Sequence, residues 1–228
     1  MKALNIPVGI SNFEKFRNNG FYYVDKTGLI EELLKTEAEV TLITRPRRFG
    51  KTLGMSMLES FFDIRKNSRK LFEGLEIARQ SELCSKWMNQ CPTVSVSFRQ
   101  VDGLNFTSAY DMLTMVFADL YNKHLYLLED SHVTEFQKKT FTNIAHGCGS
   151  EKEVKSSLVL LTTMMQQHYG KAVVLLIDEY DVPVAKANAH GYYNEMLDVM
   201  KGLLQALKDN QALCFAVSYT HLTLPTIL

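Results

Sequence analysis

The chain has 228 residues, which is enough to form one stable hydrophobic core. Hydrophobic residues make up 46% of the sequence and charged residues 22%, a composition typical of folded globular proteins. Basic and acidic residues number 25 each, so no net field attracts the chain to nucleic acid or anionic lipid. The first residues lack the apolar core of a secretory signal, and no apolar run approaches the roughly 20 residues that cross a bilayer. We therefore expect one domain, located in the cytoplasm and without a membrane partner.

Taken in chain order, four short apolar runs are predicted to form strands. The run Val40–Thr44 (VTLIT) is rich in β-branched residues, and 93–98 (TVSVSF) follows Pro92. The unbroken run 172–177 (AVVLLI) is typical of a strand buried on both faces, and 212–217 (ALCFAV) is the fourth candidate.

Between these runs, apolar residues recur every three or four positions, which predicts helices. The expected helical ranges are 108–128, 133–144, 151–169 and 192–208. A further helix is expected after Gly50, with the following side chains turned inward: Leu53, Met57, Leu58, Phe61 and Phe62. Strands that alternate with helices imply an α/β fold, with a mainly parallel sheet flanked by helices on both faces.

The motif with the clearest chemistry is the string RPRRFGKT at residues 45–52, which fits the P-loop pattern G-x-x-x-x-G-K-[ST] except at its first position. Gly50 lets the backbone approach a phosphate, at a helix N-terminus that favours an anion. Lys51 can then reach the β- and γ-phosphates, and the Thr52 hydroxyl can coordinate Mg²⁺. ATP and Mg²⁺ are the expected ligands.

The loop departs from the consensus, because Arg45 puts a Cβ where a tight turn usually has glycine, and Pro46 stiffens the chain. The guanidinium groups of Arg47 and Arg48 can pair with phosphate oxygens. We expect the nucleotide to be bound by the loop and the first helical turn, namely Arg45, Pro46, Arg47, Arg48, Phe49, Gly50, Lys51, Thr52 and Leu53.

Two acidic residues directly follow the third apolar run, as in a Walker B motif. We expect Asp178 to hold Mg²⁺ together with Thr52, and Glu179 to orient or deprotonate the attacking water. Lys51 and Glu179 are the candidate catalytic residues. Either motif alone also occurs by chance, as a helix start or a strand exit, but the two together favour a nucleotide site.

Other patterns have structural explanations. Asp25 or Thr27 is expected to cap a helix, the alternative being a segment that folds over the base. Tyr192 and Tyr193 are expected to pack rather than to form a recognition surface. The cysteines show no metal or disulfide spacing, so we expect buried, reduced thiols at Cys84, Cys91, Cys148 and Cys214.

Several strings together resemble the AAA-ATPase-like family of bacterial P-loop proteins, over a stretch from about Ile6 to Val217. They are YVDKT at 23–27, RPRRFGKT at 45–52, LESFF at 58–62, LIDEYDVP at 176–183 and GYYNEM at 191–196. The resemblance implies that Arg45 is normal in the loop. It also implies the additional-strand type of P-loop ATPase, in which the fourth strand lies between the Walker A and Walker B strands.

Relatives in this family continue with a Thr-Gly motif, an arginine-bearing segment and a C-terminal nuclease-like domain, which implies nucleic acid as a partner of the longer protein. Here the last eleven residues, 218–228 (SYTHLTLPTIL), resemble a translated sequencing adaptor. We therefore expect a P-loop domain at 1–217, incomplete at its C-terminus, followed by a non-native tail. A sensor residue is expected after Val217, so we expect ATP binding to survive in this chain better than turnover.

Three functions follow from these patterns. The first is an Mg²⁺-dependent ATPase module, which the paired motifs favour. The second is a non-hydrolysing, nucleotide-dependent scaffold that self-associates as a homo-oligomer. The third is a DNA-associated regulatory module, to which the neutral net charge runs counter. The sequence has no N/T-K-x-D motif for guanine, which favours ATP over GTP.

Overall fold

The computed structural model describes residues 9–44, 46 and 49–220, and within them a single four-stranded sheet is present. Its strands are β1 (Val40–Thr44), β2 (Thr93–Ser97), β3 (Val173–Asp178) and β4 (Leu213–Thr220). All pair in parallel, in the order β1-β4-β3-β2. The fourth strand thus lies between the strand that precedes the P-loop and the strand that ends in Asp178, as the additional-strand type requires.

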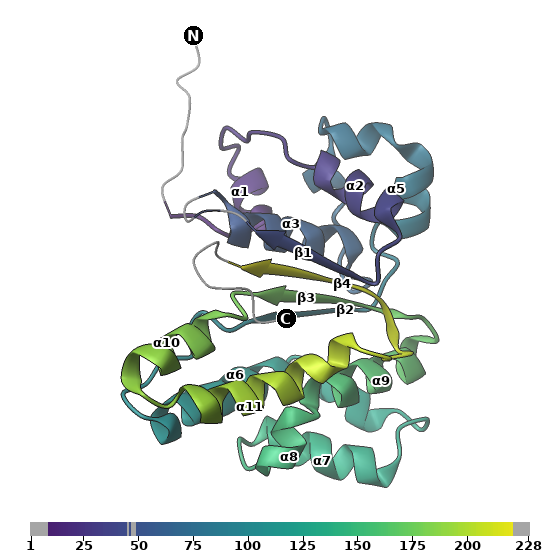
Figure 1. The fold of residues 1–228 in the computed structure, drawn as a ribbon. Helices are drawn as coiled ribbons and strands as arrows, with labels where there is room; N and C mark the ends of the chain where they lie inside the picture. Colours follow the sequence, from purple (N-terminus) through teal and green to yellow (C-terminus); the bar gives the residue numbers. More distant parts are fainter. Residues whose placement is uncertain (1–8, 45, 47–48, 221–228) are drawn as a thin grey trace.

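Helices cover both faces of this sheet, as the alternation of strands and helices predicts (Figure 1). One layer contains α1 (Phe13–Asn18), α2 (Gly28–Thr36), α3 (Lys51–Phe62), α4 (Arg69–Phe72), η1 (Glu76–Arg79) and α5 (Ser81–Trp87). The other contains α6 (Phe106–Asn122), η2 (Leu125–Glu129), α7 (Glu135–Ala145), α8 (Glu151–Lys155), α9 (Ser157–Tyr169), α10 (Val182–His190), α11 (Tyr193–Leu204) and η3 (Gln205–Leu207).

Strand β3 is central and buried along its whole length, which explains its unbroken apolar sequence. Val174 and Leu176 point into the core beneath α3, where Phe61 is fully buried. Leu175 points to the opposite side, into the core that contains Phe117 of α6. Because neighbouring residues of a strand face opposite sides, this one strand contributes to both hydrophobic cores.

Several helix boundaries differ from the sequence-based expectation. The range expected at 108–128 is interrupted at His124 between α6 and η2, and the one expected at 151–169 is divided at Ser156 into α8 and α9. Helix α10 was not predicted; it begins directly after Asp181, with proline in its first turn, a position that proline favours. Strand β4 ends at Thr220 rather than at Val217, so it includes residues that the sequence assigns to a non-native tail. The rest of that tail, 221–228, lies outside the described residues.

The four cysteines are all free thiols, as expected. Cys84 and Cys91 are buried and Cys214 is half-buried, whereas Cys148 is exposed, so the expectation of burial is wrong there. Cys148 follows α7 and lies between Gly147 and Gly149, which have no side chains to shield it. Burial raises the pKa of the Cys91 thiol to about 12, which keeps it unreactive.

The longest described helix, α6, has 17 residues. Among the helices described, none combines the length and the apolar character needed to span a bilayer.

Candidate functional site

The predicted site residues that the structure describes lie at the carboxyl edge of the sheet, where the parallel strands β1 and β3 both end. Ligands of open α/β sheets bind at this edge. Of the connection between β1 and α3, the structure describes Pro46, which is exposed, and Phe49 and Gly50. Three predicted nucleotide-binding residues, Arg45, Arg47 and Arg48, lie outside the described residues.

Gly50 forms the turn that starts helix α3. Its φ angle of 73° is in the left-handed region, which glycine adopts without a Cβ clash. Its carbonyl accepts the first helical hydrogen bond, from the Gly54 amide at 2.9 Å. Gly50, at the N-cap, provides no side-chain cap, and the first turn of α3 has no acidic residue. The amides and the dipole of a helix N-terminus favour an anion at this position.

Thr52 and Asp178 bring the two sequence motifs together. The Thr52 hydroxyl donates a hydrogen bond to Asp178 Oδ2 at 3.4 Å. The Asp178 side chain is almost fully buried, with 3% of the residue exposed, and its Oδ1 has no hydrogen-bond partner among the residues that the structure describes. A buried carboxylate oxygen without a partner is unfavourable, and a bound cation or water would relieve it. Oxygen atoms of this kind are the ligands that Mg²⁺ prefers.

The protonation of Asp178 reflects the same environment. Burial, and then the negative charge of Glu179, raise its pKa from 3.8 to about 6. The Thr52 hydrogen bond and the charge of Lys51 act in the opposite direction but are weaker. A cation bound at this position would further favour the ionised carboxylate.

Lys51 is buried, with 7% of its surface exposed, and its ammonium donates to the Thr220 carbonyl at 3.5 Å. Burial of an ammonium is costly unless polar groups surround it. This lysine thus lies between the end of β4 and the Asp178 carboxylate, whose pKa it lowers. The structure brings Lys51, Thr52 and Asp178 into one cluster.

Glu179 follows in a strained turn. Its φ angle is 55°, an unfavourable value for a residue with a side chain. The Glu179 amide donates to the Tyr219 carbonyl at 3.0 Å, and its own carbonyl accepts from Val182 at 3.1 Å. These bonds turn the chain from β3 into α10 at the carboxyl edge of the sheet.

The remaining predicted side chains behave differently. Leu53 packs against the core beneath α3, so a contribution to ligand binding would come from its backbone. Thr27 occupies the N-cap position of α2 but its side chain makes no capping hydrogen bond, so the cap interpretation is wrong for Thr27. The other candidate, Asp25, accepts a hydrogen bond from the Thr27 amide at 2.8 Å. Tyr192 is buried and its hydroxyl donates to the Gly103 carbonyl at 2.7 Å, which agrees with a packing role.

Two cations near the cluster were not predicted as part of it. Lys26 donates to the Phe49 carbonyl of the loop at 3.2 Å. The charge of Arg99, an exposed residue just after β2, lowers the pKa of Asp178. The position of Arg99 directly after a predicted strand was an available signal, because the carboxyl ends of parallel strands share an edge. For Lys26 the signal was the string YVDKT, which we interpreted as a helix cap.

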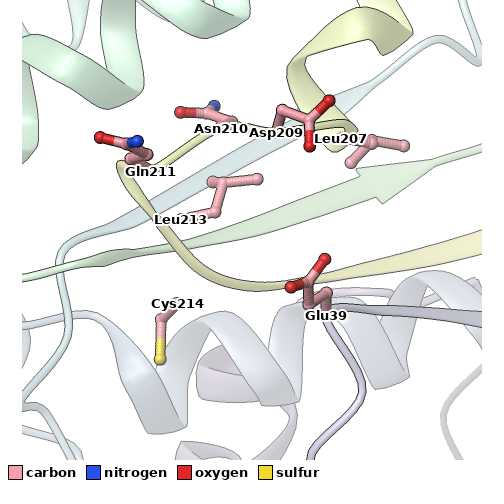
Figure 2. A pocket seen from close by; sticks show the side chains of 7 residues that line it. All are labelled: Glu39, Leu207, Asp209, Asn210, Gln211, Leu213 and Cys214. Atoms are coloured by element: carbon pink, nitrogen blue, oxygen red, sulfur yellow. The ribbon is translucent and has the colours of Figure 1, made fainter.

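A hollow of about 320 Å³ lies at the opposite edge of the sheet (Figure 2). It is lined by residues just before β1 and around the start of β4, namely Glu39, Leu207, Asp209, Asn210, Gln211, Leu213 and Cys214. The amino ends of β1 and β4 border this hollow, so it is separate from the Thr52–Asp178 cluster at their carboxyl ends.

The sheet order and the helix that follows the Gly50 turn define an α/β fold of the P-loop NTPase type. The chain belongs to the family described as Predicted AAA-ATPase, which matches residues 7–222. It is also 26% identical, over 214 residues, to a protein of Azotobacter chroococcum mcd 1 named "Uncharacterized protein in vnfD 5'region". That alignment covers 93% of this chain but 36% of the relative. No solved structure matched the chain.

Proposed function

We propose that this domain binds ATP with Mg²⁺ at the carboxyl edge of the sheet and serves as the nucleotide-binding module of an ATPase. The observation that carries the proposal is the cluster of Lys51, Thr52 and Asp178. It combines a buried ammonium, a hydroxyl and a buried carboxylate oxygen that has no hydrogen-bond partner within the described part of the chain. The N-terminus of α3 lies beside it, and backbone amides at a helix N-terminus are groups that can bind a phosphate.

Each residue then has a defined role. The amides that follow Gly50 and the Lys51 ammonium bind the phosphates. Thr52 and Asp178 hold Mg²⁺, which when bound neutralises charge on the phosphate oxygens. Asp178 suits this role because its Oδ1, which has no hydrogen-bond partner among the described residues, would gain the cation as a partner.

Glu179 orients the attacking water in this proposal and accepts its proton. Its support is the turn after β3, which places Glu179 next to Asp178 at the same edge. Asp178 is assigned to the cation, which leaves the half-buried Glu179 as the general base.

Calorimetric titration with ATP and Mg²⁺ tests the proposal. Lys51→Ala should abolish binding, and Lys35→Ala should not, because Lys35 is an exposed residue of α2 paired with Glu31. Glu179→Gln should retain binding and lose any turnover that the wild type shows. A folded wild-type domain that does not bind ATP would contradict the proposal.

Broader properties remain predictions from the sequence. They are a preference for ATP over GTP, location in the cytoplasm, self-association, and a nucleic-acid partner through a further domain. The chain spans 36% of the length of the curated relative, so the activity of a longer protein is a separate proposal.

A further inference from the structure

The segment that precedes α2 is anchored on the P-loop helix. The Tyr23 ring packs edge-on against Phe13 and Phe16, with centroids 5.5 and 5.6 Å away. Its hydroxyl donates to the Met57 sulfur of α3 at 3.3 Å. An aromatic side chain held on three sides leaves this part of the backbone little freedom.

A second anchor lies two residues further on. Asp25 Oδ1 accepts from both the amide and the hydroxyl of Thr27, at 2.8 and 2.7 Å. Its Oδ2 accepts from the Glu76 amide of η1 at 2.7 Å, and the Thr27 hydroxyl accepts from the Ile77 amide at 3.2 Å. Although burial opposes the change, these backbone hydrogen bonds hold the pKa of Asp25 below its usual value, so the carboxylate stays ionised.

Lys26 lies between these anchored residues and reaches the phosphate-binding loop. Its ammonium donates to the Phe49 carbonyl at 3.2 Å. The same atom lies 3.7 Å from the position that a Cβ on Gly50 would take. An ammonium has three donors, and the Phe49 carbonyl uses one of them. The cation is thus held against the turn that opens α3, beside the amides expected to bind phosphate.

We propose that Lys26 is a positioning residue of the nucleotide site, which fixes the Phe49–Gly50 turn and places a cation beside the bound phosphates. This inference rests on the proposed function. It differs from the P-loop roles because Lys26 comes from a separate segment, fixed to α3 by Tyr23 and to η1 by Asp25. A helix cap would explain neither the direction of the Lys26 side chain nor its bond to the loop.

The test compares Lys26→Met, Lys26→Arg and Lys35→Met by calorimetry with ATP and with AMP, each with Mg²⁺. Loss of one charge-assisted contact should weaken ATP binding about tenfold in Lys26→Met, with a smaller effect on AMP, which has fewer phosphates. Lys26→Arg should restore most of the affinity for ATP, and Lys35→Met should match the wild type. Thermal unfolding of each variant shows whether the fold is intact.

Two further measurements separate this inference from the proposed function. If the wild type binds ATP and Lys51→Ala abolishes binding, but Lys26→Met binds ATP like the wild type, Lys26 has no role in the site and the inference is wrong. If the wild type itself does not bind, both proposals fail. Asp25→Asn should weaken ATP binding in the wild type but have little effect in Lys26→Met; equal effects in both backgrounds would overturn the positioning role.

Discussion

The Thr52 hydroxyl lies 3.4 Å from Asp178 Oδ2, although the two residues are 126 positions apart in the sequence. This contact joins the helix after the P-loop to the end of the central strand. In the proposed function, this hydroxyl and this buried carboxylate hold the cation that is bound to the nucleotide phosphates.

Asp178→Asn should stabilise the nucleotide-free domain. The folded-state pKa is raised from 3.8 to about 6, so the stability that this carboxyl contributes is fully present below pH 3.8 and is lost as the pH rises through 6. At pH 8 the neutral asparagine should therefore increase the free energy of unfolding by on the order of 1–3 kcal/mol. Urea unfolding at pH 4 and pH 8 measures this, with Asp111→Asn on the exposed face of α6 as the control. If Asp178→Asn does not increase the free energy of unfolding at pH 8, the ionised Asp178 carboxylate does not destabilise the fold.

Gly50→Ala should affect both the fold and the site. A left-handed φ of 73° costs a residue with a side chain about 1 kcal/mol. Gly74 has a similar φ of 79° and no atom near its missing Cβ, so Gly74→Ala carries the same strain away from the site. Both variants should lose similar stability in urea unfolding, but Gly50→Ala alone should lose affinity for ATP. If Gly50→Ala and Gly74→Ala bind ATP with equal affinity, the Gly50 turn does not contact the nucleotide.

The strands, and the meeting of Thr52 with Asp178 at their carboxyl edge, could be predicted because the signals in the sequence are local. The run before Asp178 is apolar because β3 is buried on both faces, and the acid stands at its carboxyl end. The contact of Lys26 with Phe49 could not be predicted, because it depends on how the Tyr23 segment packs on α3. Helix α10 was missed because its sequence has only a weakly apolar face and starts directly after the strand exit.

His124 should make the domain sensitive to acid. Burial, and then the nearby charge of Arg65, lower its pKa from 6.5 to about 3. The folded protein therefore excludes a proton that the unfolded chain binds, and stability should fall as the pH decreases from 6.5 towards 3. The slope from this residue is at most about 1.4 kcal/mol per pH unit. His124→Gln should reduce the slope measured by urea unfolding, whereas His146→Gln, at an exposed position, should leave it unchanged.

Phe61→Ala tests the core that supports the P-loop helix. Phe61 is fully buried and packs edge-on against Phe62 and Phe72, with centroids 5.1 and 5.4 Å away. Its truncation should reduce the free energy of unfolding by about 3–5 kcal/mol. Phe136 of α7 is 78% exposed, so Phe136→Ala should change the free energy of unfolding by less than about 0.5 kcal/mol. Similar losses in both variants would place the supporting core elsewhere.

The most direct test of the site is the Mg²⁺ dependence of ATP binding in Thr52→Val, Asp178→Asn and the double variant. If the two residues hold one cation, calorimetry will show that Mg²⁺ strengthens binding to the wild type, that each substitution removes this gain, and that the double variant is no weaker than the single ones. Additive losses, or ATP binding to the wild type that is the same with and without Mg²⁺, would contradict a shared cation site at Thr52 and Asp178.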